Sequence, residues 1–426
     1  MPSPSDIAVP PNTASLPALL SNVPEQESQD KNSLIPKNVS KTASNAFTPT
    51  TESEASAKAR LHTQLKVQQL PAATKATLGD FKVNNVCPDW RTHPKHVLSE
   101  AAMQVYRRSG LLSSNREAYI RAGHSVGFYF APHASHVGAN ALGMLMVWFF
   151  AVDDQIDDDH IQDRGKAEDF LDRIRDAFLR AKESMGKPID TASMSELQKL
   201  TVEVHSAFLK LCENRPALYE RFMDDLSDWL DSIVPFNFEF RTSERTDEAI
   251  ACRMINIGAQ ATLIGMAIVN EVQLSLRLLN NPHAESARHI AFHHLTLQND
   301  LVSYHSDTKK PERLKNNLLT VLMARNKVPE NDTEQGLTLA ERELRNMEEK
   351  IEMHINLMRT SCRTLPNEEV ETYARLIYEL VGGSWGWSVE EARYRDSANI
   401  IPELRTILAL GARAADEGWS AETAGN

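Results

Sequence analysis

The segment from Phe149 to Asp159 reads FFAVDDQIDDD, an apolar run that ends in five aspartates within seven positions. On a helix, Asp153 and Asp157 lie one turn apart, as do Asp154 and Asp158, so at least two carboxylates share a face. Two carboxylates about 4 Å apart repel each other by roughly 4 kcal/mol at a partly buried site, so a cation is expected there. These hard oxygen donors favour Mg2+, which completes its shell with water and substrate phosphates. A solvated acidic helix end is the alternative, because runs of charge usually lie on the surface.

A second set of oxygen-bearing side chains occurs in HIAFHHLTLQNDLVSYHSDTKK, residues 289–310. Asn299, Ser303 and Asp307 are four residues apart and therefore lie along one face of a helix. An amide oxygen, a hydroxyl and a carboxylate on one stripe form a possible second site for a hard cation. Ordinary polar residues at a helix end would produce the same pattern.

One charge interrupts the apolar segment 252–270, CRMINIGAQATLIGMAIVN. A helix that is apolar nearly all round belongs in a protein core, and Gly258 is where this one is expected to break or kink. Arg253 on such a helix needs an anionic partner. That partner is either an acid in a structural ion pair or the anionic part of a ligand.

The elements that must position these groups are helices. Apolar residues recur at helical spacing in six further segments, 96–112, 168–182, 195–212, 218–236, 341–362 and 370–394. No Asn-Gly or Asp-Gly hairpin signal joins valine-rich runs, and no repeat of fixed period is found. We therefore predict one all-α domain over residues 81–415, followed by a tail at 416–426.

The first 80 residues differ in composition from the rest of the chain. Ten of the twenty prolines fall within the first 88 residues, among many Ser, Thr, Asn and Gln. Such a segment cannot bury enough apolar surface to offset the entropy lost on ordering. We predict a disordered leader over residues 1–80.

Composition also restricts partners and compartment. The net charge of -12 argues against a nucleic-acid partner, which needs a basic face. The four cysteines show no CxxC spacing, as expected in a reducing compartment. No apolar run approaches the length of a membrane span, and the start of the chain lacks the features of a secretory signal. We expect a cytoplasmic protein.

The order and spacing of these features resemble those of class I terpene cyclases. FFAVDDQIDD is similar to their aspartate-rich DDxxD motif, and NDLVSYHSD to their second metal motif, NDxxSxxxE. Arg253 lies 46 residues before Asn299, which is where microbial members carry an arginine that senses the diphosphate. Arg393 and Tyr394, in WSVEEARY, resemble the RY pair near the C-terminus of these enzymes.

The resemblance implies a class I terpenoid synthase-like helical bundle with a central apolar pocket. Metal sites would face each other across the mouth of this pocket. Asp153 and Asp157 would bind Mg2+ on one wall, and Asn299, Ser303 and Asp307 on the other. Together with the substrate diphosphate they would hold three Mg2+ ions.

The same resemblance implies the residues that contact the substrate. Three would bind the diphosphate and three aromatic side chains would face the carbocation: Arg253, Arg393 and Tyr394, and Phe130, Phe150 and Trp387. Aromatic faces stabilise a cation by about 0.5–2 kcal/mol without attacking it. Each of the three aromatics could equally be a core residue. Asp153, Arg253, Arg393 and Tyr394 are expected to be catalytic.

Three positions depart from the family pattern, and one is Ser306, where many fungal-type members have a lysine just before the acid. Asp307 ends the second motif where the family usually has Glu, so its carboxylate reaches one methylene less far. Asn256 stands where an acid usually links the sensing arginine to a backbone carbonyl at the helix break, here that of Ile257.

The expected function is Mg2+-dependent ionisation and cyclisation of farnesyl diphosphate to a sesquiterpene hydrocarbon or alcohol, with release of diphosphate. A diterpene cyclase acting on geranylgeranyl diphosphate is the close alternative, because only the single-domain size favours the shorter substrate. A chain-elongating prenyltransferase would need a second aspartate-rich motif. A non-catalytic helical binding protein with the same fold is a further alternative, and the resemblance leaves a homodimer open.

Overall fold

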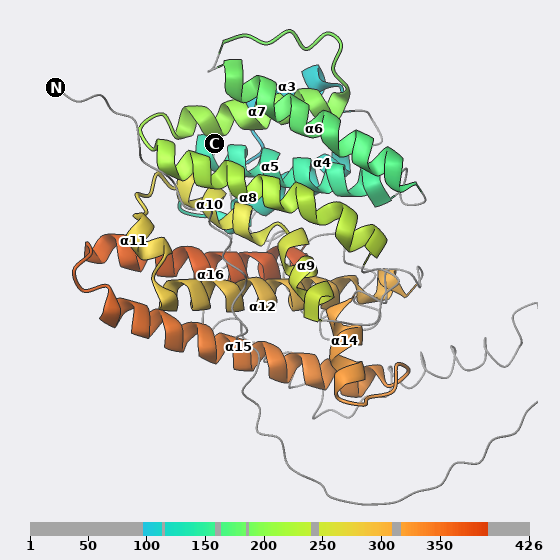
Figure 1. The fold of residues 1–426 in the computed structure, drawn as a ribbon, viewed down its shortest axis with the longest axis vertical. Coiled ribbons are helices and arrows are strands. Elements are labelled where there is room, and N and C mark those ends of the chain that lie inside the picture. The colour runs from blue at the N-terminus through green and yellow to red at the C-terminus, as the bar shows by residue number, and fades with distance from the viewer. Residues whose placement is uncertain are drawn as a thin grey trace, which may run out of the picture. The chain divides into compact units, whose positions relative to one another are not determined.

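The computed structural model describes residues 97–112, 116–157, 163–184, 187–239, 247–308 and 317–390, which all lie in one compact unit, Ala55–Asn426. Every regular element within these ranges is a helix, so the all-α prediction is confirmed (Figure 1). The predicted leader at 1–80 and the tail at 416–426 lie outside the described residues.

The helices fall close to the segments that apolar periodicity predicts. A π-helical turn, η3, continues α8. In chain order the elements are α3 Glu100–Ser109, α4 Glu117–Phe130, α5 His136–Gln155, α6 Arg164–Ser184, α7 Glu196–Leu211, α8 Pro216–Val234, η3 Pro235–Glu239, α9 Asp247–Asn256, α10 Ala259–Val269, α11 Leu276–Leu279, α12 Pro282–Asp307, α14 Leu318–Arg325, α15 Thr333–Ser361 and α16 Asn367–Glu390.

Helices α5 and α10 form the interior of the domain and pack against each other. Gly138–Phe149 of α5 and Ala261–Val269 of α10 are buried without interruption, because both helices are apolar on all sides. By length and composition, His136–Gln155 and Asp247–Val269 could each cross a membrane. However, 78% of the apolar window of each is buried inside the protein, which is the environment of a core helix.

The predicted break in the second apolar helix is confirmed at Gly258. This residue has φ 73° and ψ 10°, in the left-handed region that favours glycine, and it separates α9 from α10. A Cβ at this position would lie 3.4 Å from the Phe149 ring. The break lets Arg253 on α9 take a different direction from the buried α10.

The buried Arg215 donates hydrogen bonds to backbone carbonyls at the C-terminal ends of α7 and α10. Arg215 Nη1 donates hydrogen bonds to the carbonyls of Val272 at 3.1 Å and Ala267 at 3.4 Å. Its Nη2 donates to the carbonyls of Leu211 at 2.6 Å and Ile268 at 3.0 Å. Carbonyls at helix ends carry partial negative charge, so Arg215 joins the end of α7 to the end of α10.

Helix α12 carries the second motif and packs against α9, α14, α15 and α16. It lies between α15 and α16 in Figure 1. Helix α10 contacts both α12 and α5, the helix that carries the first motif. The two motif-bearing helices are therefore positioned by a common core helix.

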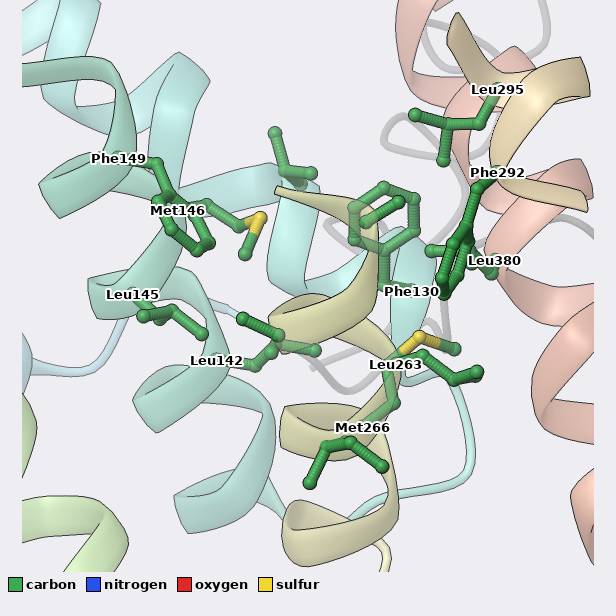
Figure 2. Close-up of a cluster of buried hydrophobic side chains, with 14 of the residues drawn as sticks. Phe130, Leu142, Leu145, Met146, Phe149, Leu263, Met266, Phe292, Leu295 and Leu380 are labelled. Atoms are coloured by element: carbon green, nitrogen blue, oxygen red, sulfur yellow. The ribbon is translucent and has the colours of Figure 1, made fainter. Parts of the chain in front are cut away.

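Buried hydrophobic side chains fill the space among α5, α10, α12 and α16 (Figure 2). Leu142 of α5 points toward α10. Phe130, at the end of α4, lies beside Phe292 of α12 and Leu380 of α16. These side chains form an apolar core among the helices that carry the motifs.

Candidate active site

The first acidic motif lies at the C-terminal end of α5, where Asp153 and Asp157 are partly buried. Their neighbour Asp154 accepts a hydrogen bond from the Tyr119 hydroxyl of α4 at 2.5 Å. Asp154 also lines a cleft of about 620 Å³, and the described residues around this cleft include neither Asp153 nor Asp157. Asp154 is thus held toward α4. Asp158 lies outside the described residues.

Arg253, near the end of α9, contacts the second motif directly. Its Nη2 donates to Asp300 Oδ1 at 2.7 Å and to Asn299 Oδ1 at 3.1 Å. Its Nη1 donates to Asn256 Oδ1 at 3.3 Å. The guanidinium also lies over the Phe236 ring of η3, 5.3 Å from the ring centroid. The anionic partner expected for this arginine is therefore an aspartate within the second motif.

Electrostatic interactions connect Arg253 to both motifs. Burial alone would lower the pKa of Arg253, but the charge and hydrogen bond of Asp300 raise it above its ordinary value. The charges of Asp153 and Asp307 add to this increase. Only 14% of the Arg253 side chain and 3% of the Asp300 side chain are exposed. Carboxylates from α5 and α12 therefore act on one permanently charged guanidinium.

Helix α12 carries Asn299, Ser303 and Asp307 at the predicted four-residue intervals. The Ser303 hydroxyl donates to Asp307 Oδ2 at 2.9 Å. Octahedral Mg2+ with ligands at about 2.1 Å places adjacent ligand oxygens about 3 Å apart. The Ser303 and Asp307 Oδ2 oxygens lie at this separation because the hydroxyl donates to the carboxylate, so the two side chains meet on the α12 wall. The Asn299 amide oxygen has two lone pairs, so it can accept from Arg253 and still face a cation.

The donor chemistry of the two motifs fits a magnesium ion. Within the described ranges, no three Asp, Glu, His or Cys side chains are grouped closely enough to hold a metal ion alone. Asp307 is instead accompanied by hydroxyl and amide oxygens on its wall. Mg2+ typically binds one or two carboxylates and takes its remaining ligands from water and phosphate.

Two residues that the sequence analysis left unassigned contribute to the α12 wall. Asp300 Oδ2 accepts the backbone N–H of Leu318 at 2.7 Å. Asn317 Nδ2 donates to the Asp300 carbonyl at 2.6 Å and to Asp307 Oδ2 at 3.0 Å. Asp300 is the second letter of NDLVSYHSD and could have been noted there. Asn317 has only the preference of asparagine for a helix start as its signal.

Asn256 occupies the end of α9, next to the helix break. Its carbonyl accepts a hydrogen bond from Trp229 Nε1 at 2.8 Å, which anchors the end of α9 to α8. Its side-chain oxygen contacts Arg253, whereas its buried Nδ2 has no hydrogen-bond partner in the part of the chain that the structure describes. An amide thus makes the contact that an acid makes in the family pattern.

The three predicted aromatic residues occupy two places. Phe150 of α5 stacks on Trp387 of α16, with ring centroids 5.7 Å apart and planes at 19°. Trp387 Nε1 donates to the Ala122 carbonyl at 3.1 Å and to Ser125 Oγ at 3.2 Å, so the stack rests on α4. Phe130 lies separately in the apolar cluster of Figure 2.

Phe149, which was not among the predicted residues, packs beside the helix break. Its ring lies 4.5 Å from Trp229 at an angle of 69° and faces Gly258. In a run of two phenylalanines, the sequence alone does not say which ring turns toward α10. The last two predicted site residues, Arg393 and Tyr394, lie outside the described residues.

In comparisons with known proteins, the chain is similar to terpene synthases. The family model described as terpene synthase family 2, C-terminal metal binding, matches residues 144–338. Terpene synthase 6 of Dictyostelium discoideum is 24% identical over 345 residues, which are 78% of this chain and 90% of that protein.

Solved structures share the fold. Cucumene synthase is similar with a TM-score of 0.52 and 18% identity, covering 70% of this chain and 97% of that one. Germacradien-4-ol synthase from Streptomyces citricolor has a TM-score of 0.55 and 14% identity, covering 70% and 96%.

The fold is that of terpene synthases, and the matched family model describes a metal-binding terpene synthase domain. The matched family model and these relatives are terpene synthases, so the resemblance to class I terpene cyclases seen in the sequence is confirmed. The chain's activity is terpene cyclisation, its substrate is an isoprenoid diphosphate, and it uses a divalent metal ion.

Proposed function

We propose that this terpene synthase is an Mg2+-dependent sesquiterpene cyclase, which ionises farnesyl diphosphate and closes the chain to a cyclic hydrocarbon or alcohol. The observation that carries the proposal is the environment of Arg253. This residue contacts Asn299 and Asp300 of the second motif and is stabilised by the charge of Asp153 of the first. Such an arrangement can stabilise the negative charge that develops on a departing diphosphate.

The metal-binding residues are assigned to two walls. Asp153 and Asp157 would hold Mg2+ at the end of α5, and Asn299, Ser303 and Asp307 would do so on α12, for a total of three ions. When bound, these ions act as Lewis acids on the leaving group. The hard oxygen donors favour Mg2+ over metals that prefer nitrogen or sulfur ligands.

Arg253 is assigned the binding of diphosphate oxygens. Asp300 and the Phe236 ring restrict its guanidinium, so its N–H groups need little reorganisation when the substrate arrives. Arginine suits this role because its planar fork of donors matches phosphate geometry. Arg393 and Tyr394 are assigned to the same diphosphate through their likeness to the family's RY pair.

The apolar interior is assigned to the isoprenoid chain. A carbocation reacts with any water it meets, so the chamber must exclude water before ionisation. Phe130, Phe150 and Trp387 are proposed to stabilise the cation with their ring faces, by about 0.5–2 kcal/mol each. The stacked Phe150 and Trp387 rings would act as one aromatic surface.

The preference for farnesyl over geranylgeranyl diphosphate rests on the size of the helical domain and is tested directly. Purified enzyme is incubated with Mg2+ and, separately, with geranyl, farnesyl and geranylgeranyl diphosphate. Volatile products are identified by gas chromatography with mass spectrometry. We expect cyclic sesquiterpenes from farnesyl diphosphate, no product in EDTA, and recovery when Mg2+ is restored. Cyclic diterpenes as the main products would replace the proposed substrate, and no cyclic product from any of the three would overturn the proposal.

A further inference from the structure

The start of α14 packs against the second metal motif, and the buried Asn317 side chain donates two hydrogen bonds to it. Asn317 is 2% exposed. Its Oδ1 accepts the Leu319 backbone N–H at 3.0 Å and so caps α14. Its Nδ2 donates to the Asp300 carbonyl at 2.6 Å and to Asp307 Oδ2 at 3.0 Å. The side-chain oxygen of Asn317 thus caps α14, whereas its side-chain nitrogen donates to the metal motif.

The hydrogen bond from Asn317 restricts the orientation of the Asp307 carboxylate group. Asp307 Oδ2 accepts two hydrogen bonds, from Asn317 Nδ2 and from the Ser303 hydroxyl at 2.9 Å. Two donors on one oxygen fix the plane of the carboxylate group and direct its remaining lone pairs. An aspartate reaches one methylene less far than a glutamate, so its orientation decides whether an oxygen meets the ion.

We propose that Asn317 is a positioning residue of the metal site, which holds the Asp307 carboxylate in the orientation that binds the ion. This inference rests on the proposed function, because it assigns Asp307 to Mg2+. Asn317 acts through Asp307 and touches neither substrate nor metal. Loss of a partner that orients a metal ligand typically weakens metal affinity by about 10–100-fold.

The two roles of Asn317 can be separated by substitution. Asn317→Ser keeps a good N-cap, because serine and asparagine are nearly equal at that position. The serine hydroxyl is too short to reach both the Asp300 carbonyl and Asp307. The variant therefore keeps the helix cap and loses the support of Asp307.

The opposite end of α12 offers a matched control. Asn281 Oδ1 caps that helix by accepting the N–H groups of His283 at 3.0 Å and Ala284 at 3.2 Å. Its Nδ2 donates to the Ser361 hydroxyl at 3.0 Å, at the end of α12 remote from the motif. Asn281→Ser therefore changes a cap of the same type without touching Asp307.

The measurement is the thermal stabilisation of the full-length protein by inorganic diphosphate as Mg2+ is titrated. It is supported by calorimetric titration and needs no turnover. We expect Asn317→Ser to raise the half-saturating Mg2+ concentration about 10-fold or more, and Asn281→Ser to leave it unchanged. In an Asp307→Ala background, Asn317→Ser should add no further effect, because the cycle isolates coupling between the two residues.

Each outcome separates this inference from the proposed function. If the parent protein shows no Mg2+-dependent stabilisation by diphosphate, the proposed function fails. If the parent responds and Asn317→Ser needs the same Mg2+ concentration, the positioning role is overturned. An undiminished effect of Asn317→Ser in the Asp307→Ala background would also overturn it. Should Asn317→Ser not fold, Asn317→Thr provides the same test, and failure of both to fold would make the residue purely structural and overturn the inference.

Discussion

Within NDLVSYHSD, the neighbouring residues Asn299 and Asp300 have different roles. Both carboxylate oxygens of Asp300 are occupied, Oδ1 by Arg253 and Oδ2 by the backbone N–H of Leu318. Asn299 Oδ1 accepts one hydrogen bond from Arg253 Nη2 at 3.1 Å, and an amide oxygen has two lone pairs. Asp300 is therefore suited to hold the arginine, and Asn299 to bind the ion. This division explains why the acid is not the assigned ligand although it carries the charge.

Replacing one proposed ligand on each wall should abolish turnover without unfolding the protein. We expect Asp153→Ala and Asn299→Ala each to lower kcat at least about 100-fold, because each removes stabilisation of the departing diphosphate. The free energy of unfolding should change by less than about 1 kcal/mol, since neither substitution opens a cavity in the core. Product formation from farnesyl diphosphate and urea unfolding measure the two quantities.

Exposed residues of the same types serve as controls for this pair. Asp172→Ala and Asn326→Ala change side chains on α6 and after α14 that are exposed, and both variants should turn over at the parent rate. An Asp153→Ala or Asn299→Ala enzyme that also keeps the parent rate would contradict the metal assignment.

At the level of single residues, the sequence is informative where chemistry is local. The spacing of Asn299, Ser303 and Asp307 follows from helical periodicity alone. Phe236 and Asn317 could not be predicted in this way. They reach Arg253 and Asp307 from other elements, η3 and α14, and their positions depend on how those elements pack.

At the level of elements, composition predicts which helices are buried but not which side-chain hydrogen bonds hold the helices together. Uniformly apolar letters identify α5 and α10 as core helices, and Gly258 marks the break before α10. Arg215 gave no such signal, because it stands in the polar stretch CENRPALYE. Its buried position depends on the helix ends that meet around it. The structural role of Arg215 is therefore recognised only from the packed structure, where it donates to backbone carbonyls.

Arg215 should matter for stability although it lies outside the site. Arg215→Met keeps much of the volume but leaves the carbonyls of Leu211, Ile268 and Val272 without their donor. Since a hydrogen bond to a charged group contributes about 1.5–3 kcal/mol, we expect the free energy of unfolding to fall by about 3–5 kcal/mol. Urea unfolding followed by circular dichroism measures this change.

The control for this substitution is an arginine with a surface partner. Arg108 donates to Glu203 at 2.6 and 2.7 Å, but more than half of its side chain is exposed. Exposed ion pairs contribute about 0–1 kcal/mol, so Arg108→Met should cost no more than that. Equal losses for the two variants would mean that the carbonyl contacts of Arg215 are not what stabilises the fold.

At the level of the whole molecule, two buried histidines join helices and a third is half-buried. His124 accepts from the Tyr106 hydroxyl through Nδ1 at 2.6 Å and contacts Asn140 Oδ1 through Nε2 at 3.1 Å. His205 pairs with the Tyr219 hydroxyl, and His293 lies on α12. Burial lowers the pKa of each of the three histidines from 6.5 to about 4. The folded protein therefore holds them uncharged in a range where the unfolded chain would protonate them.

This difference predicts a loss of stability in mild acid. Between pH 6.5 and 4 the unfolded chain binds more protons at these sites than the folded protein, so the free energy of unfolding falls as the pH falls. At pH 5 each such histidine should cost about 2 kcal/mol relative to pH 7.5. Urea unfolding at the two pH values measures the change, and His205→Gln should reduce the difference by about 2 kcal/mol, because that site no longer titrates. Equal stability at pH 7.5 and pH 5 would show that the three rings are already hydrated or charged in the folded state.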